Sequence, residues 1–298
     1  PGFINVFLNA EAKFAVLDDI FALQERFGLS NQFDGQKIQV EFVSANPTSS
    51  LHVGHGRGAA FGMSVANLLE AIGYDVTREY YVNDAGRQMD ILATSTYLRY
   101  LETNGEQVIF PVNGYQGDYV SEIAQTLKAQ HGDRYVHSFA AIAKDVPADA
   151  KFEINEGGEK TLLAGDKEAH IDGLIANSKA LLGEGYELFL NAALSSILAD
   201  IKDDLNDFGV RYECWFSERS IDSEIEPVLQ ILDEKGYLYE KDGNIWFKST
   251  DFGDEKDRVV RRANGQSTYF ASDIAYHKNK FDRGFDKVVN VWGADHHG

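Results

Sequence analysis

The segment "ANPTSSLHVGHGRGAA", residues 45–60, contains two histidines, three glycines and one proline, a composition that no ordinary core helix or strand has. The segment before it, "KIQVEFV" (37–43), alternates polar and apolar residues and predicts a strand with Ile38, Val40 and Phe42 on one face. The glycine-rich segment is therefore expected to be a turn at the carboxyl end of this strand.

A helix and a second strand are predicted after the turn. Residues 61–76 repeat apolar side chains at helical spacing, and Gly73 stands where a helix would stop. Residues 75–82, "DVTREYYV", read as a strand. Strand, turn, helix and strand in this order form the βαβ unit of a parallel sheet.

Free backbone N–H groups at the start of such a helix, together with the helix dipole, favour a phosphate. Gly54, Gly56 and Gly58 would let that phosphate approach the backbone, and His52 and His55 would donate hydrogen bonds to it. No Gly-Lys-Ser/Thr follows, which excludes a P-loop.

Two other interpretations of the histidine pair stay open at this point. His52 and His55 could be metal ligands, although no further cluster of Cys, His or Asp lies near them in the sequence. They could also be capping or core histidines without any chemistry.

Composition narrows the class of protein. The 298 residues are 44% hydrophobic, which is typical of a folded globular protein, and the net charge of −19 argues against a broadly basic nucleic-acid-binding surface. One cysteine, Cys214, fits a reducing compartment. We find no membrane span or signal peptide in the sequence, so we expect a cytoplasmic protein with no membrane partner.

Both ends suggest a fragment of a longer protein. The first ten residues, "PGFINVFLNA", alternate in polarity and predict a strand, and the chain closes on "VVNVWGADHHG", a strand followed by a histidine-rich turn.

The middle of the chain is predicted to be a largely helical insertion, residues 97–210. It includes a short amphipathic helix, an exposed polar connection over 154–170 and a long helix over 186–210. Strands return afterwards, with hairpin turns expected at Asp242-Gly243 and Asn264-Gly265 and a buried parallel strand in "KVVNVWGAD". The fold class is therefore α/β, a Rossmann-like parallel sheet with a helical insertion.

Seven motifs add a family resemblance. "HVGH" at 52–55 resembles the HIGH signature of class I aminoacyl-tRNA synthetases. With the flanks "VEFVSANPT", "GHGRGAAFG", "TREYYVNDAGRQM", "GDYVSEIA", "WFSERS", "STYFASDIAYHKNKF" and "GADHHG", the chain resembles bacterial-type arginyl-tRNA synthetases from residue 38 to 298.

The resemblance implies roles for individual residues. His52 and His55 would be catalytic contacts to the ATP phosphates, and Gly54, Gly293 and Asp295 would complete the ATP site. The residues implied in arginine binding are Asn46, Glu79, Asn83, Asp84, Tyr269, Asp273 and His297. Physical chemistry agrees in part, because paired carboxylates such as Glu79 and Asp273 suit a guanidinium group.

Plainer interpretations of these residues stay open. Glu79 and Asp84 could be solvated strand-end charges, Asp273 a helix cap and Tyr269 a core aromatic. Trp215, Phe216 and Arg219 look structural, and the three arginines 258, 261 and 262 fit a solvated hairpin face better than a contact to tRNA phosphate.

The resemblance also implies a division into four parts. Residues 1–34 would end an N-terminal tRNA-binding domain, 35–96 and 211–298 would be the two halves of the catalytic domain, and 97–210 the insertion. A KMSKS-like loop and an anticodon-binding domain are missing, so we expect the fragment alone to be inactive or weakly active.

The implied substrates are L-arginine, ATP with Mg²⁺ and tRNA(Arg), with no metal caged by the protein and a monomeric state. The alternatives are another nucleotidyl transferase with the same turn, and a non-catalytic paralogue that binds arginine or nucleotide.

Overall fold

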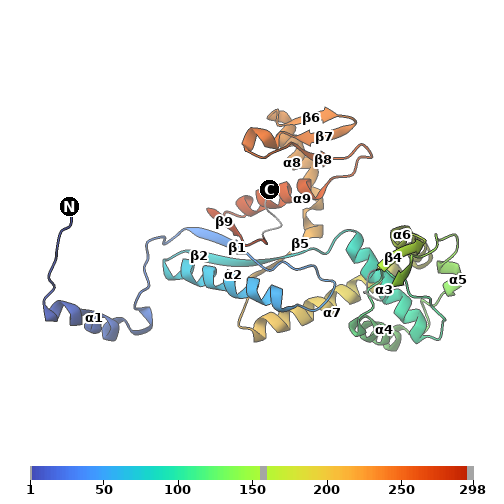
Figure 1. Ribbon diagram of the computed structural model, residues 1–298, viewed down its shortest axis with the longest axis horizontal. Helices are drawn as coiled ribbons and strands as arrows, with labels where there is room; N and C mark the ends of the chain where they lie inside the picture. Colours follow the sequence, from blue (N-terminus) through green and yellow to red (C-terminus); the bar gives the residue numbers. More distant parts are fainter. Residues whose placement is uncertain (1, 155–159, 294–298) are drawn as a thin grey trace.

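A four-stranded parallel sheet organises the chain (Figure 1). The computed structural model describes residues 2–154 and 160–293. The strand order is β5-β2-β1-β9, with bounds β1 Lys37–Glu41, β2 Asp75–Val82, β5 Cys214–Ser217 and β9 Lys287–Asn290. The predicted α/β class with a parallel sheet is confirmed.

The predicted βαβ unit is present. Helix α2, Val53–Ala71, follows β1 and returns the chain to β2, which runs parallel to β1. The helix begins at Val53 rather than at 61, because the glycine-rich segment forms its first turns. Its contact with the sheet is close: a Cβ on Gly62 would lie 2.2 Å from the Phe42 ring.

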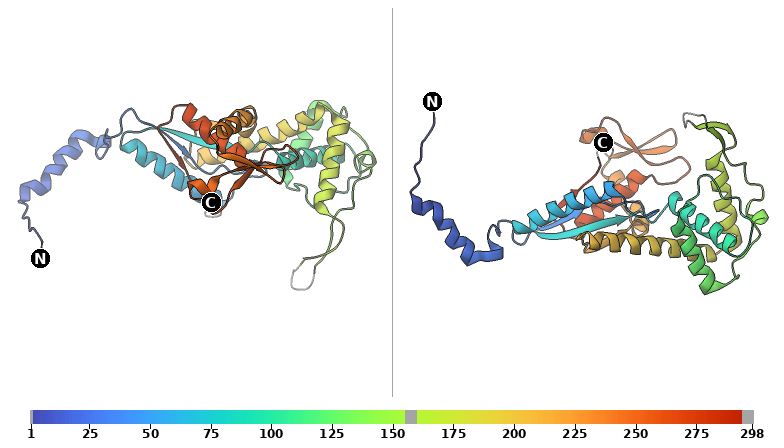
Figure 2. Two further views of the ribbon diagram at one scale, coloured as in Figure 1. Left: turned by 90° about the horizontal axis from the view of Figure 1, so that it is seen from above. Right: turned by 60° about the horizontal axis from the view of Figure 1, so that its bottom comes forward.

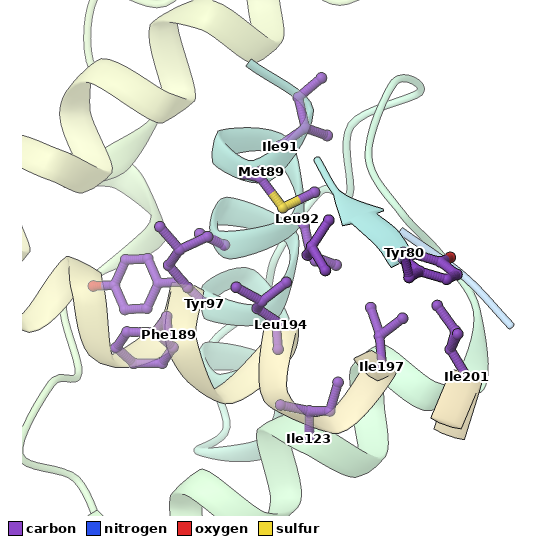
Figure 3. Close-up of a cluster of buried hydrophobic side chains, with 14 of the residues drawn as sticks. Tyr80, Met89, Ile91, Leu92, Tyr97, Ile123, Phe189, Leu194, Ile197 and Ile201 are labelled. Atoms are coloured by element: carbon purple, nitrogen blue, oxygen red, sulfur yellow. The ribbon is translucent and has the colours of Figure 1, made fainter. Parts of the chain in front are cut away.

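Helices α3 Arg87–Thr103, α4 Asp118–His131, α5 Phe139–Ile142, α6 Lys167–Leu182 and α7 Gly185–Asp207 make up the helical middle of the chain. Figure 3 shows side chains of α3, α4 and α7 packed in one cluster with Tyr80 of β2. This region therefore shares a hydrophobic core with the sheet.

The expected polar connection over 154–170 is wrong in part. β3 Lys151–Ile154 and β4 Lys160–Ala164 pair as an antiparallel hairpin, and α6 begins at Lys167. The apolar side chains of β4, Leu162 and Leu163, are exposed. The strand therefore lacks the alternation of buried apolar and exposed polar residues by which a strand is recognised in a sequence.

A smaller antiparallel sheet follows β5. The short 3-10 turn Glu218–Ile221 leads into α8 Asp222–Glu234, then β6 Leu238–Lys241, β7 Asn244–Phe247, the 3-10 turn Ser249–Phe252 and β8 Arg258–Arg261. The hairpin at Asp242-Gly243 is confirmed. At Asn264-Gly265 only one bridge forms, between Arg261 and Ser267, because α9 (Tyr269–Asp282) starts directly afterwards.

The strand predicted for the first ten residues is wrong for residues 2–9, which form no strand. Helix α1, Ala10–Leu23, follows with Asn9 as its N-cap, and the short turn Gln24–Arg26 ends it. Figure 2 shows this segment extending away from the sheet, and none of the described strands pairs with it. Alternation alone cannot supply a partner.

Among the described residues, no helix has the length and apolarity that a membrane crossing requires.

We expect Gly62→Ala to destabilise the protein by about 1–3 kcal/mol, because the added methyl group would overlap the Phe42 ring. Gly58→Ala is the matched control on the same helix, since a Cβ there would meet nothing within 4 Å. Urea unfolding measures both. Equal stability of the two variants would contradict the close contact between α2 and Phe42, the residue that follows β1.

Candidate active site

A cavity of about 940 Å³ lies where β1, β2 and β9 end and α9 crosses them. Ligands of open parallel sheets bind beyond the carboxyl ends of the strands, which is where this cavity lies. The residues from the sequence expectation that line it are Asn46, His55, Asn83, Tyr269, Asp273 and Gly293. Asp295 and His297 lie outside the described residues.

The two histidines cap α2. His52 Nδ1 accepts a hydrogen bond from the Gly54 N–H at 3.1 Å, and His55 Nδ1 accepts one from the His52 N–H at 3.2 Å. Their rings stack with centroids 3.7 Å apart, and burial together with the charge of His52 lowers the pKa of His55. The capping interpretation thus describes their contacts, while only His55 reaches the cavity lining.

Gly54 is explained by the same cap. A Cβ at this position would lie 2.9 Å from Cε1 of the His52 ring, so a larger residue would disturb the cap. The close approach of a phosphate that the sequence predicts here would be compatible with this structural role.

Asn46 and Asn83 meet at the ends of β1 and β2. Asn83 Nδ2 donates to Asn46 Oδ1 at 3.0 Å. The turn after β1 passes through left-handed backbone at Val43 and Ser44, with φ of 67° and 43°. The Ser44 hydroxyl accepts from the Tyr81 N–H at 3.0 Å, which ties this unusual backbone to β2.

Glu79 does not line the cavity. It is fully buried, accepts from both terminal nitrogens of Arg283, and accepts from the Tyr276 hydroxyl at 2.6 Å. Although burial opposes it, these hydrogen bonds hold the pKa of Glu79 below its ordinary value. Glu79 was expected to bind the guanidinium group of the substrate. In the structure it binds the guanidinium group of Arg283 instead.

Asp84 is also engaged within the protein. Its carboxylate accepts from the Ser217 hydroxyl at 2.6 Å and from the Arg219 N–H at 3.2 Å. Arg219 Nε donates to the Asp84 carbonyl, and Trp215 stacks on Tyr80 at 4.4 Å. These contacts tie β2 to β5, which matches the structural interpretation of Trp215 and Arg219.

The sequence analysis missed Glu218. This side chain is 7% exposed, its Oε2 has no hydrogen-bond partner in the part of the chain that the structure describes, and its charge acts on Tyr81 of the cavity wall. Burial, with the nearby carboxylates of Asp84, Asp222 and Asp273, raises the pKa of Glu218 to about 7. The motif "WFSERS" contains the residue, but no periodicity in the sequence indicates its burial.

Glu41 was missed as well. It lines the cavity from β1, directly opposite Glu79 in the strand register. Lys280 Nζ lies 2.6 Å from Glu41 Oε2 and is fully buried. The alternation of residues 37–43 placed Glu41 on the polar face, but could not show that a helix covers that face.

No group of three or more His, Cys, Asp or Glu side chains able to hold a metal ion occurs among residues 2–154 and 160–293. A metal-ligand role for His52 and His55 therefore finds no further ligands in the described residues. Their mutual capping contacts account for both Nδ1 atoms.

We expect Arg283→Met to destabilise the protein by about 3–5 kcal/mol, because it leaves Glu79 buried and unpaired. Lys278→Met on the same helix should change stability by about 1 kcal/mol or less, because its partner Asp282 is exposed. Since the pKa of Glu79 is lowered, its stabilisation is present above the ordinary value of 4.5 and is lost as the pH falls through the folded-state pKa.

Urea unfolding at pH 7 and at lower pH measures these effects. A loss in Arg283→Met no larger than that in Lys278→Met would show that the buried pair does not stabilise the fold.

Comparison with known proteins agrees with the geometry. Residues 18–128 match the family model of class I tRNA synthetases (R), catalytic domain. The whole chain is 92% identical to an arginine–tRNA ligase of Psychrobacter arcticus and 66% identical to one of Acinetobacter baumannii, covering 49% and 50% of those proteins. A solved arginyl-tRNA synthetase from Campylobacter jejuni shares 31% identity at a TM-score of 0.76, with 98% of this chain and 55% of that chain covered.

The chain thus spans about half the length of the curated relatives it matches. None of these relatives favours a non-catalytic paralogue or another nucleotidyl transferase. Sequence similarity to these proteins extends over all 298 residues, and a cavity lies at the ends of the parallel strands. The chain therefore belongs to the arginyl-tRNA synthetase family and carries its class I catalytic fold.

Proposed function

We propose that this chain forms the arginine-activating site of an arginine–tRNA ligase. The full-length protein would join L-arginine to ATP as arginyl-adenylate and transfer it to tRNA(Arg). The observation that carries the proposal is the cavity itself, which has a capped helix N-terminus with His55 on one side and Asp273, backed by Glu218, on the other. Such a cavity suits an anion and a cation side by side.

The anion would be the ATP triphosphate. The first turn of α2 presents backbone N–H groups and the positive end of the helix dipole, which favour phosphate. His55 lines the cavity there, and Gly293 lines it at the end of β9. In this proposal His52 and Gly54 shape the turn, and Asp295 completes the nucleotide site.

The cation would be the arginine side chain. Asp273 and Tyr269 reach the cavity from the first turns of α9, and Glu218 lies behind the lining residues, close to Tyr81 and Asp273. A carboxylate pair is the preferred partner of a guanidinium group. Asn46 and Asn83 line the cavity at the ends of β1 and β2 and would bind the amino-acid end, and the family resemblance assigns His297 to the same ligand.

Glu79 and Asp84 support this site rather than contact the substrate in our proposal. Glu79 holds Arg283 and the cavity-lining Tyr276, and Asp84 holds Ser217 and Arg219, the two residues that flank Glu218.

The reaction needs little covalent chemistry from side chains. The arginine carboxylate would attack the α-phosphorus of ATP in line and displace pyrophosphate, whose bond to that phosphorus breaks, so positioning and charge stabilisation would lower the barrier. Mg²⁺ would come with ATP, bound by phosphates and water.

We further propose a monomeric, cytoplasmic full-length protein. Within it, residues 1–34 would end a tRNA-binding domain, 35–96 and 211–298 would form the catalytic domain around the insertion 97–210, and the chain by itself would be weakly active or inactive.

Calorimetric titration tests the substrate. The full-length protein should bind L-arginine far more tightly than L-lysine, on the order of 10⁴-fold, because lysine lacks the forked donors that a carboxylate pair requires. A non-hydrolysable ATP analogue, added first, tests whether the two ligands occupy the site together. Equal affinity for the two amino acids would contradict the proposal.

Arginine affinity should depend on pH through Glu218. Its pKa of about 7 means that it is mostly protonated in the empty site at pH 6, and a guanidinium bound beside it at Asp273 would favour its ionised form, so binding would release that proton. We therefore expect affinity to rise by up to about tenfold per unit as the pH approaches 7, and then to level off.

Glu218→Gln should weaken arginine binding at pH 8 and abolish this pH dependence. Asp222→Asn, which removes a neighbouring carboxylate at the start of α8, is the matched control and should keep the dependence. Titration at pH 6 in two buffers of different ionisation enthalpy measures the released proton. Binding without proton release would argue against a role of Glu218.

A further inference from the structure

A chain of four polar side chains runs beneath one wall of the cavity, from Glu41 through Lys280 and Asn290 to His277. Lys280 Nζ donates to Glu41 Oε2 at 2.6 Å and to Asn290 Oδ1 at 2.7 Å. Asn290 Nδ2 lies 3.0 Å from His277 Nε2. The first and last members of the chain, Glu41 and His277, both line the cavity.

The chemistry of the donors fixes the direction of every hydrogen bond in this chain. The Lys280 ammonium can only donate, so the Asn290 atom that faces it is the amide oxygen. The Asn290 NH₂ group then faces His277 Nε2 and can only donate, so Nε2 must be an acceptor. A second contact leads to the same result: His277 Nδ1 lies 2.8 Å from the Asp273 carbonyl oxygen, which can only accept.

We propose that Lys280 is a positioning residue that orients the Glu41 carboxylate and, through Asn290, holds His277 as the neutral tautomer protonated at Nδ1. This inference rests on the proposed arginine site for its functional meaning. Neither Lys280 nor Asn290 lines the cavity, so both act through Glu41 and His277.

The arrangement suits a site that binds a cation. Lys280 is fully buried between the Glu41 carboxylate, the Asn290 oxygen and the face of the Tyr276 ring, 4.2 Å from its centroid. An imidazolium at position 277 would repel an incoming guanidinium or ammonium group, whereas the neutral ring does not. The ring meets Trp292 edge-on at 6.1 Å, so its orientation also shapes the wall near Gly293.

The tautomer can be read without any ligand. In the full-length protein with ¹⁵N-labelled histidine, and with His277→Gln to assign the signal, long-range ¹H–¹⁵N correlation spectra should show His277 protonated at Nδ1 alone. Lys280→Met should raise the fraction of His277 rings that carry a proton at Nε2, because Asn290 is then free to turn its amide oxygen toward that atom and only the Asp273 carbonyl still favours the proton at Nδ1. The control is Lys278→Met, two residues earlier on α9, where the side chain pairs with the exposed Asp282. This variant should leave the His277 signal unchanged.

The functional half of the inference is measured by titration. Lys280→Met should weaken arginine binding about tenfold or more through misplacement of Glu41 and His277, and leave the affinity for the ATP analogue within about twofold. Asn290→Leu breaks only the link to His277, keeps the Lys280–Glu41 pair, and gives the same tautomer test if Lys280→Met does not fold. An unchanged His277 signal in Asn290→Leu, or unchanged arginine affinity in folded Lys280→Met, would overturn the inference.

Failure of the proposed function would look different. If the wild-type protein bound no arginine, the substrate proposal would fall, while the spectra would still decide whether Lys280 sets the tautomer of His277.

Discussion

Two glutamates side by side on neighbouring parallel strands are the constraint on which this structure depends. Glu41 of β1 and Glu79 of β2 are in register and almost fully buried, so each needs a cation. Lys280 and Arg283, at the end of α9, provide them, and the Tyr276 hydroxyl hydrogen-bonds both carboxylates. These contacts hold α9 across the ends of the strands, and the helix then forms one wall of the cavity.

This pairing also divides the charges of the site. The carboxylates in the middle of the sheet are balanced by cations of the protein itself, whereas Glu218 lies among other carboxylates and keeps a raised pKa. A low-dielectric interior tolerates an excess of negative charge only with a proton or a cationic ligand present. In the proposed reaction, arginine would be that cation, and the acidic end of the cavity would select it.

The opposite end of the cavity is organised by a helix terminus. His52 and His55 satisfy backbone groups at the start of α2 and stack on each other, which gives the turn a rigid form before any ligand arrives. A preorganised terminus loses little entropy when it binds phosphate. Structural capping and the proposed phosphate binding are therefore compatible in one arrangement, and the sequence analysis treated them as alternatives only because contacts could not be seen.

The sequence by itself determined the features that depend on local pattern: the strand–turn–helix–strand unit around residues 45–60, the long helix α7, the hairpin at Asp242-Gly243 and the family motifs. Only the tertiary structure decided the partners of individual side chains. Arg283 lies far from Glu79 in the sequence, so no motif spacing could show that Arg283 pairs with the carboxylate that was expected to bind the substrate. For the same reason the strand predicted at residues 2–9 was wrong and the burial of Glu218 was not predicted. A partner strand and a covering element are properties of the folded chain.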